Sequence, residues 1–160
     1  RDWGHAKDYV RMMWMILQAE QPEDWVIATG ITTTVREFVR LAFEEVGIEV
    51  DFKGEGVNEK GYIKSINHDI YIAVANIEYL KTNIDLAIGK ELLSVDPTYF
   101  RPTEVDLLIG DPSKAKNKLG WVPEHNLSYL VKDMMKSDMD LMKKDIILLK
   151  AGHEVLKQAE

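Results

Sequence analysis

The chain has 160 residues, of which 46% are hydrophobic and 29% are charged. This length and apolar content suffice for one substantial core, so a single domain is the natural count. The net charge of −7, from 27 acidic and 20 basic residues, argues against a basic face that binds nucleic acid. No apolar run approaches the roughly 20 residues of a membrane span. The absence of cysteine excludes disulfides and fits a cytoplasmic location, so we expect a soluble cytoplasmic protein.

Apolar residues at helical spacing predict a first helix over residues 5 to 18. His5 stands just before this helix and is expected to be a structural hydrogen-bonding residue. The methionines of the helix are typical core filler, and the four histidines lack metal-ligand spacing, so we expect no metal site. Residues 25–29 form a short apolar run closed by Gly30, which is typical of a buried strand in a parallel sheet.

Thr34 and Glu37 have the spacing of a capping box and predict a helix that begins there and ends at Gly47. Arg36 therefore lies in a first turn, where unpaired backbone N–H groups and the helix dipole favour anions. It is equally compatible with an ordinary solvated surface position. Alternating apolar and acidic residues then predict a half-exposed strand over residues 48–52.

Residues 54–56 read Gly-Glu-Gly, and we interpret them as a loop. They are not a dinucleotide fingerprint because no third glycine follows and because Glu55 and Glu59 would repel phosphate. Residues 57–90 lack a clean period, and residues 71–75 fit either a strand or a helix. We interpret this part as an altered or inserted segment on a surface-exposed connection, where added length is tolerated.

Residues 91–96 are predicted to return as a strand, and residues 105–109 form a second extended run. Asp111 is a suitable N-cap for a helix over residues 112–119 that ends at Gly120. Trp121 is expected to anchor the core. Asn126 can cap a long final helix that reaches about residue 151. Asp138 interrupts its apolar seam, so the helix either leaves the domain surface or breaks near that point.

The stretch from Tyr99 to Glu104 places a cation and a carboxylate three residues apart. Arg101 is fixed beside Pro102, where the chain is stiff, and its planar guanidinium could bind a phosphate or a carboxylate. Glu104 could accept hydrogen bonds from a sugar hydroxyl or a base amine. A surface ion pair followed by an ordinary helix cap explains the same residue types, and both interpretations remain open at this point.

Two long motifs carry a resemblance to a known family. The order R-P-x-E, then G-D-x-x-K-A-x-x-x-L-G-W, between Arg101 and Trp121 resembles the C-terminal signature of extended short-chain dehydrogenase/reductases that act on nucleotide sugars. R-D-W-G-H-A-K-D-Y-V, which begins at Arg1, resembles a second segment of these enzymes. With Q-P-E-D-W-V-I-A-T-G, T-V-R-E-F-V and Y-F-R-P-T-E-V, the chain is similar to the GDP-mannose 4,6-dehydratase family. The match runs from residue 1 to about 144, is interrupted near residues 60 to 90, and covers the family's C-terminal part.

The resemblance implies an α/β fold in three parts. Residues 1–46 would be the C-terminal remnant of an NADP-binding Rossmann domain with a parallel sheet. Residues 47–152 would form the mixed α/β lobe that binds the nucleotide sugar, with an insertion near 57–90, and residues 153–160 a frayed tail. The family implies a cytoplasmic lyase that is a homodimer or homotetramer. It converts GDP-mannose to GDP-4-keto-6-deoxymannose, on the route to GDP-fucose, with NADP bound mainly by an N-terminal part.

The resemblance also implies roles for individual residues. Arg1 and Arg101 would clamp the pyrophosphate, Glu104 would contact the ribose or the base, and Arg36 would bind pyrophosphate or ribose. The sequence contains no glycine-rich Rossmann turn and no Tyr-x-x-x-Lys pair, since Tyr129 and Lys132 are one residue too close. We therefore expect no catalytic or cofactor-binding residue in this chain, and no activity from it alone.

The chain begins inside a motif and without methionine, which we interpret as a fragment of a longer enzyme. Two alternatives remain open on the sequence. One is part of an epimerase or dehydratase that acts on a UDP- or dTDP-sugar. The other is a non-catalytic nucleotide-binding module.

Overall fold

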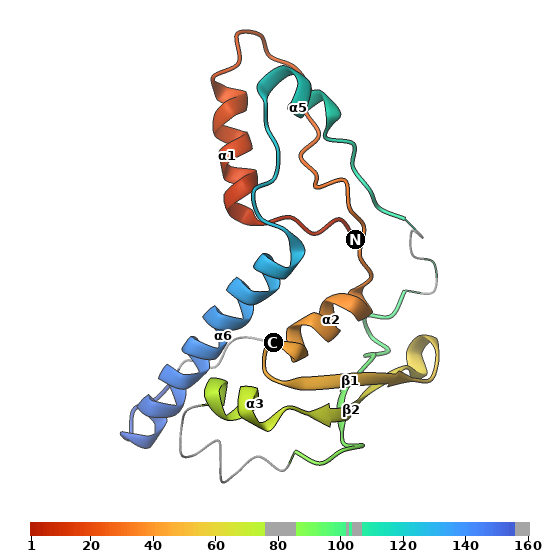
Figure 1. Ribbon diagram of the computed structural model, residues 1–160, viewed down its shortest axis with the longest axis vertical. Coiled ribbons are helices and arrows are strands. Elements are labelled where there is room, and N and C mark those ends of the chain that lie inside the picture. The colour runs from red at the N-terminus through yellow and green to blue at the C-terminus, as the bar shows by residue number, and fades with distance from the viewer. Residues whose placement is uncertain (76–85, 102, 104–106, 156–160) are drawn as a thin grey trace.

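The computed structural model describes residues 1–75, 86–101, 103 and 107–155. The fold is mixed α/β, as predicted, and Figure 1 shows two regions joined by a long helix. The helical region consists of residues 1–33 and 107–126, and the sheet region of residues 34–75 and 86–101. The elements, in chain order, are α1 Ala6–Leu17, α2 Val35–Glu44, β1 Ile48–Lys53, the 3-10 turn η1 Gly56–Asn58, β2 Lys60–Ile66, α3 His68–Ala75, β3 Glu91–Ser94, α5 Ser113–Leu119 and α6 Leu127–Lys150.

The sheet region is built on three antiparallel strands in the order β1-β2-β3. The alternation that predicted β1 is confirmed, because it buries Ile48 and Val50 against Ile63 of β2. Helix α2 packs on β1 and covers this core with Phe43, while Val46 follows from the turn after the helix. Leu92 and Leu93 of β3 also pack against it, so apolar side chains from four elements close the core of this region.

The connection between β1 and β2 is a loop, as the sequence predicted, and it contains the 3-10 turn η1. Gly54 has a φ of 88°, a backbone conformation that side chains other than glycine rarely adopt. The prediction of a surface-exposed connection over residues 57–90, however, is wrong for Lys60–Ile66. These residues form the central strand, and Ile63 is only 1% exposed. The burial comes from β1 on one side and β3 on the other, which the local sequence of this segment does not encode.

Helix α3 resolves the ambiguity over residues 71–75, which are helical up to the last described residue of that segment. The strand predicted over residues 91–96 is confirmed as β3, Glu91–Ser94. The start of α5 differs by one residue from the prediction. The helix begins at Ser113, and the carboxylate of Asp111 accepts a hydrogen bond from the backbone N–H of Ser113 at 2.9 Å.

The helical region has a separate core made of Met12, Ala115 and Trp121, which are all fully buried. Gly120 ends α5 as predicted. The turn at Gly120 directs Trp121 back under the helix, where the indole N–H donates a hydrogen bond to the backbone oxygen of Asp8 at 3.1 Å. The prediction that Trp121 anchors the core is confirmed.

Residues 25–29 do not form the predicted strand of a parallel sheet in the described part of the chain. The segment has the side-chain alternation of a strand, because Trp25 and Ile27 pack on the Met12 core while Val26 is half exposed. An extended segment becomes a strand only when neighbouring segments pair with its backbone, and parallel neighbours come from distant parts of a sequence. Periodicity within the segment could not show whether such neighbours are present.

Helix α6 joins the two regions. The Asn126 side chain accepts a hydrogen bond from the N–H of Tyr129 at 2.9 Å, and the helix then continues for 24 residues, or about 36 Å. It is continuous through Asp138, so the predicted alternative of a break is wrong. The helix contacts α2 and buries Val131. None of the helices in the described residues is both long and apolar enough to span a membrane.

Candidate functional site

Arg1 is held at the loop that leads into α2. Its terminal amino group donates to the backbone oxygen of Thr33 at 2.7 Å, and the N–H of Thr33 donates back to the backbone oxygen of Arg1 at 2.9 Å. The next residue fixes this position, because the Asp2 carboxylate accepts hydrogen bonds from Thr29 and from the N–H of Gly30. Arg1 is exposed at this loop.

The carboxylate of Asp2 is a structural group. Its burial raises its pKa, but the hydrogen bonds from Thr29, Gly30 and Gly110 lower the pKa by more, and the result lies below the ordinary value. Asp2 is therefore ionised at neutral pH, and its hydrogen bonds fasten the start of the chain to the 29–30 turn. The geometry of Arg1 depends on this anchor.

Arg36 lies in the first turn of α2, as predicted. Thr34 caps the helix by accepting a hydrogen bond from the N–H of Glu37 at 3.1 Å. The guanidinium makes two contacts with the carboxylate of Glu59, at 2.7 and 2.6 Å, and lies 5.6 Å from the centre of the Phe52 ring. Arg36 of α2 is thus ion-paired to Glu59 in the hairpin turn, and an anionic ligand would compete with Glu59 for the guanidinium.

Arg101 follows a segment that packs against the same hairpin turn. The N–H of Val95 donates to the backbone oxygen of Glu59 at 3.3 Å. The Phe100 ring lies so close to Gly56 that a Cβ there would stand 3.6 Å from it. Arg101 itself is exposed. Glu104, the fourth predicted site residue, lies outside the described residues.

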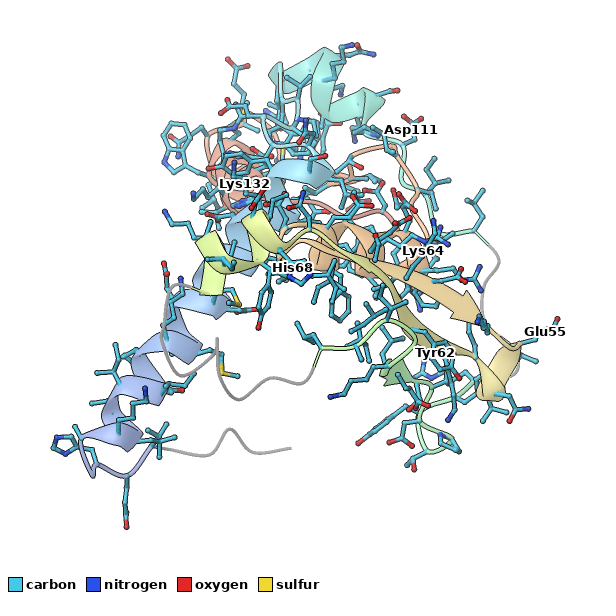
Figure 2. The ribbon with its side chains drawn as sticks, turned by 60° about the horizontal axis from the view of Figure 1, so that its bottom comes forward. Glu55, Tyr62, Lys64, His68, Asp111 and Lys132 are labelled. Carbon is cyan, nitrogen blue, oxygen red and sulfur yellow. The ribbon has the colours of Figure 1, made fainter. Side chains whose placement is uncertain are left out.

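The structure therefore brings the segments of all three arginines to one end of α2. Arg1 is linked to Thr33, Arg36 starts the helix, and Arg101 ends the segment that contacts the turn to which Arg36 is paired. The N-terminal end of a helix adds a favourable field for an anion. The tip of the hairpin does not, since Glu55 stands there, as Figure 2 shows. Such a group of cations can hold an anion such as a pyrophosphate.

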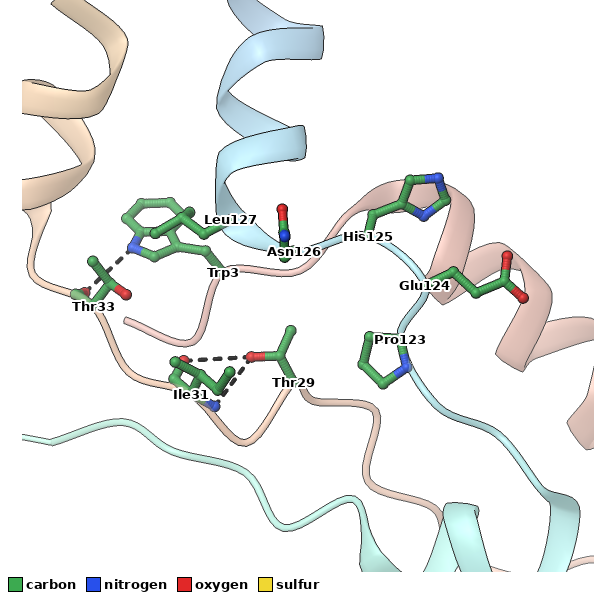
Figure 3. Close-up of a pocket in the computed structure, with 9 residues that line it drawn as sticks. All are labelled: Trp3, Thr29, Ile31, Thr33, Pro123, Glu124, His125, Asn126 and Leu127. Atoms are coloured by element: carbon green, nitrogen blue, oxygen red, sulfur yellow. Dashed lines mark hydrogen bonds between the residues drawn. The ribbon is translucent and has the colours of Figure 1, made fainter. Parts of the chain in front are cut away.

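A pocket of about 260 Å³ opens on the other side of the Arg1–Thr33 contact. It lies between the 29–33 loop and the start of α6, and the side chains of Glu124 and His125 point away from Trp3 and Thr29 (Figure 3). The indole N–H of Trp3 donates to the backbone oxygen of Thr33 at 3.3 Å. The lining residues are Trp3, Thr29, Ile31, Thr33, Pro123, Glu124, His125, Asn126 and Leu127.

Since its two ionisable side chains are directed outward, the pocket suits an uncharged group better than a phosphate. None of the predicted site residues lines it. Sequence reasoning missed this pocket because its walls come from three segments that are distant in the chain, and the motifs that contain Trp3 and Thr29 do not show that these residues lie together.

A network of histidines and aspartates ties α6 to α1. The carboxylate of Asp8 accepts a hydrogen bond from the N–H of His125 at 3.0 Å and lies 3.0 Å from Nδ1 of that ring. His5 accepts a hydrogen bond from the N–H of Lys7, and its Nε2 is 3.2 Å from Asp133. The prediction that His5 is a structural hydrogen-bonding residue is confirmed.

Asp8 is the buried centre of this network. Burial raises the pKa of its carboxyl, but the hydrogen bonds from the His125 side chain and from the N–H groups of His125 and Glu124 outweigh that effect and lower the pKa below 3.8. Elsewhere too, the described residues contain no group of three side chains that could hold a metal ion. The network is therefore structural, and it holds the 123–127 segment where it forms one wall of the pocket.

The described residues do not fit NADP. The Gly54–Gly56 turn closes an antiparallel hairpin, whereas a dinucleotide site needs a glycine turn between a strand and a helix. Tyr129 lies beside Lys7, whose Nζ is 5.9 Å from the ring centre, and its ring makes tilted contacts with the rings of His5 and His125. These contacts make Tyr129 part of the packing around the His–Asp network.

Comparison with known proteins identifies the family. Residues 1–134 match the family model described as GDP-mannose 4,6 dehydratase. The chain is 49% identical to the GDP-mannose 4,6-dehydratase of Yersinia enterocolitica and 46% identical to that of Vibrio cholerae O1, over 97% of this chain and 38% of each relative. It is 46% identical to the GDP-mannose 4,6 dehydratase of Drosophila melanogaster, over 92% of this chain and 32% of that protein. The chain spans about a third of the length of these relatives, and it belongs to the GDP-mannose 4,6-dehydratase family.

Proposed function

We propose that this chain is the nucleotide-sugar-binding part of a GDP-mannose 4,6-dehydratase and that it holds the GDP group of GDP-mannose. The match of residues 1–134 to the family carries this proposal. The segments of Arg1, Arg36 and Arg101 lie near one end of α2, which supports the proposal because a diphosphate is held by several cations. In this assignment Arg1 and Arg101 bind the pyrophosphate, Arg36 binds pyrophosphate or ribose, and Glu104 binds ribose or base.

The complete enzyme would be a lyase that forms GDP-4-keto-6-deoxymannose, with NADP supplying the redox chemistry when bound. Because the residues of this chain do not fit NADP, we assign the cofactor and the catalytic residues to the part of the enzyme that this chain does not span. The contribution of this chain is binding energy from a remote, non-reacting part of the substrate, which positions the sugar for the reaction.

The domain assignment follows from the same proposal. Residues 1–46 would belong to the Rossmann domain, residues 47–152 would form the substrate-binding lobe, and residues 153–160 would be a tail. The two separate cores divide the chain differently, because Ala115 and Trp121 pack with Met12, whereas Phe43 packs with the sheet. We expect the complete protein to be a cytoplasmic homodimer or homotetramer.

Nucleotide binding by the isolated chain tests this assignment. We expect calorimetric titration to show that GDP binds and that UDP and dTDP bind at least about tenfold more weakly, a difference of about 1.4 kcal/mol. Arg101→Ala should weaken GDP binding by at least about tenfold, because it removes a charge-assisted contact to phosphate. Arg11→Ala is the matched control, since Arg11 pairs with Glu124 of the helical region.

Three results would contradict the proposal. Equal or tighter binding of UDP or dTDP would favour an enzyme of the same superfamily with a different substrate. An equal loss in the Arg101 and Arg11 variants would show that charge alone, and not the predicted contact, affects binding. No binding of any nucleotide would refute a nucleotide site in this chain.

A further inference from the structure

Arg36 is paired with a carboxylate that its own helix does not supply. Its Nε–H donates to Oε1 of Glu59 at 2.7 Å, and its Nη2 lies 2.6 Å from the same oxygen. Glu59 stands in the connection between β1 and β2, and 19% of its side chain is exposed, against 51% for Arg36. The carboxylate is therefore the more enclosed partner, while half of the arginine side chain remains accessible to solvent.

The backbone of Glu59 is fixed on both sides. Its N–H donates to the backbone oxygen of Gly56 at 3.1 Å, and its backbone oxygen accepts a hydrogen bond from the N–H of Val95 at 3.3 Å. The guanidinium carbon of Arg36 lies over the ring of Phe52, 5.6 Å from its centre. The cation is thus held by the ring and by the carboxylate together, and the negative charge of Glu59 is a built part of this end of α2.

This carboxylate opposes what the rest of the candidate site does. The start of a helix favours negative charge, and so do the arginines whose segments lie near it. Such a site attracts phosphorylated nucleotides in general, and more strongly as their charge increases. A phosphate bound to Arg36 lies within the width of one guanidinium from Glu59, so the two like charges repel each other. The cost of this repulsion grows with the charge of the phosphate.

We propose that Glu59 is a specificity-determining residue, which favours a sugar nucleotide over a nucleotide that ends in a free phosphate. In a sugar nucleotide the terminal phosphate is esterified and carries a single negative charge. A free terminal phosphate has a second ionisation with a pKa of about 6 and carries about −1.5 to −2 at pH 7. Glu59 penalises this additional charge, and repulsion of a competing ligand is a general source of specificity. The inference rests on the proposed function and, within it, on contact between Arg36 and the pyrophosphate.

A purely structural ion pair is the competing explanation. It would fasten α2 to the hairpin and would affect all ligands alike. The structure gives such a fastening little to do, because Phe43 already packs α2 on the core of the sheet region. Ion pairs in which one partner is half exposed also contribute little to stability. A change in the preference between ligands of different charge is the property that separates the two explanations.

Two ligands that differ in one ionisation test the proposal. They are GDP and its methyl ester on the terminal phosphate, which keeps the nucleotide but lacks the second ionisation. Calorimetric titration of the full chain with each ligand gives the ratio of the two affinities. Relative to the unmodified chain, Glu59→Gln should shift this ratio toward GDP by at least about threefold, because it removes the charge and keeps a side chain of similar shape.

Glu55→Gln is the matched control. It removes the same charge from the same connection, but Glu55 stands at the tip of the hairpin (Figure 2), and Arg36 is paired with Glu59 instead. The control should leave the affinity ratio nearly unchanged, since the field of an exposed charge is screened by salt. Both variants should unfold at a denaturant concentration close to that of the unmodified chain, which excludes a general loss of structure.

The proposal is overturned if Glu59→Gln changes both affinities by the same factor, or if it shifts the ratio toward the methyl ester. It is also overturned if the shift is no larger than that of Glu55→Gln. In each of these cases GDP still binds, so the proposed function stands. If neither ligand binds to any of the three proteins, the proposed function fails, and this inference fails with it.

Discussion

The two regions of this molecule differ in how completely their backbone groups are paired and their apolar side chains are covered. In the sheet region, β2 is paired on both sides and α2 covers the core. In the helical region, an equally well-buried core around Trp121 is bordered by residues 25–28, which have no backbone partner among the described residues. Four apolar side chains of α1 are also exposed, and we call them the outer face of α1: Val10, Met13, Trp14 and Leu17. A buried core therefore does not by itself show that a region is structurally complete.

The difference also separates the candidate functions of the two regions. The segments that carry the predicted arginines lie near the start of α2, in or next to the sheet region. The helical region has exposed apolar side chains on α1, and residues 25–28 have no backbone partner among the described residues. The predictions below test this contrast by changing each region in turn.

The largest effect is expected from Trp121→Ala. It removes a fully buried indole and its hydrogen bond to the Asp8 backbone, which should lower the free energy of unfolding by about 3–5 kcal/mol. Chemical denaturation followed by circular dichroism measures the loss. Because the two cores are separate, amide protection of Ile63 and its neighbours in β2 should persist where protection in α1 is lost. Simultaneous loss of protection in both regions would show that they form one cooperative unit.

A smaller effect is expected from Asp8→Asn. The folded state lowers the pKa of Asp8 below 3.8, so its ionised form stabilises the protein above about that pH, and this stabilisation is lost as the pH falls through the lowered value. At pH 7 the substitution should cost about 1.5–3 kcal/mol, the range for hydrogen bonds to charged groups. Urea unfolding of both proteins at pH 7, 5 and 3 measures the difference, which should shrink at pH 3. A difference that is the same at pH 3 and pH 7 would contradict this role of the carboxylate.

The smallest effect gives the most direct comparison of the regions. Ile63→Val deletes a single methyl group from the closed core of the sheet region and should cost about 0.5–1.5 kcal/mol. Trp14→Ala deletes a whole indole from the outer face of α1 and should change the stability of the isolated chain by less than about 0.5 kcal/mol. Denaturation midpoints of the two variants, measured side by side, test the order. A larger loss for Trp14→Ala would mean that the outer face is covered within the chain itself.

Much of the local structure could be predicted from the sequence. Thr34 and Asn126 cap their helices as expected, Gly120 ends α5, and the alternation over residues 48–52 indicates a strand with one buried side. The family was also identified correctly from a few long motifs. These signals are local, because caps, turns and periodic patterns act within a few residues of one another.

The site could be predicted only in part. The sequence indicated the arginines, but not that Arg36 is paired with Glu59 or that the segment before Arg101 packs on the hairpin turn. It gave no sign of the pocket beside Trp3. These contacts join residues that are distant in the chain, so no pattern within one segment encodes them.

The sequence by itself thus determined the ends of most helices, the turn at Gly54 and the family. The tertiary structure decided which extended segments became strands. Lys60–Ile66 has no clear pattern and yet lies at the centre of the sheet, whereas residues 25–29 have the composition of a buried strand and lack a ladder. The physical reason is that a helix satisfies its backbone hydrogen bonds within itself, while a strand depends on neighbours that the rest of the chain has to supply.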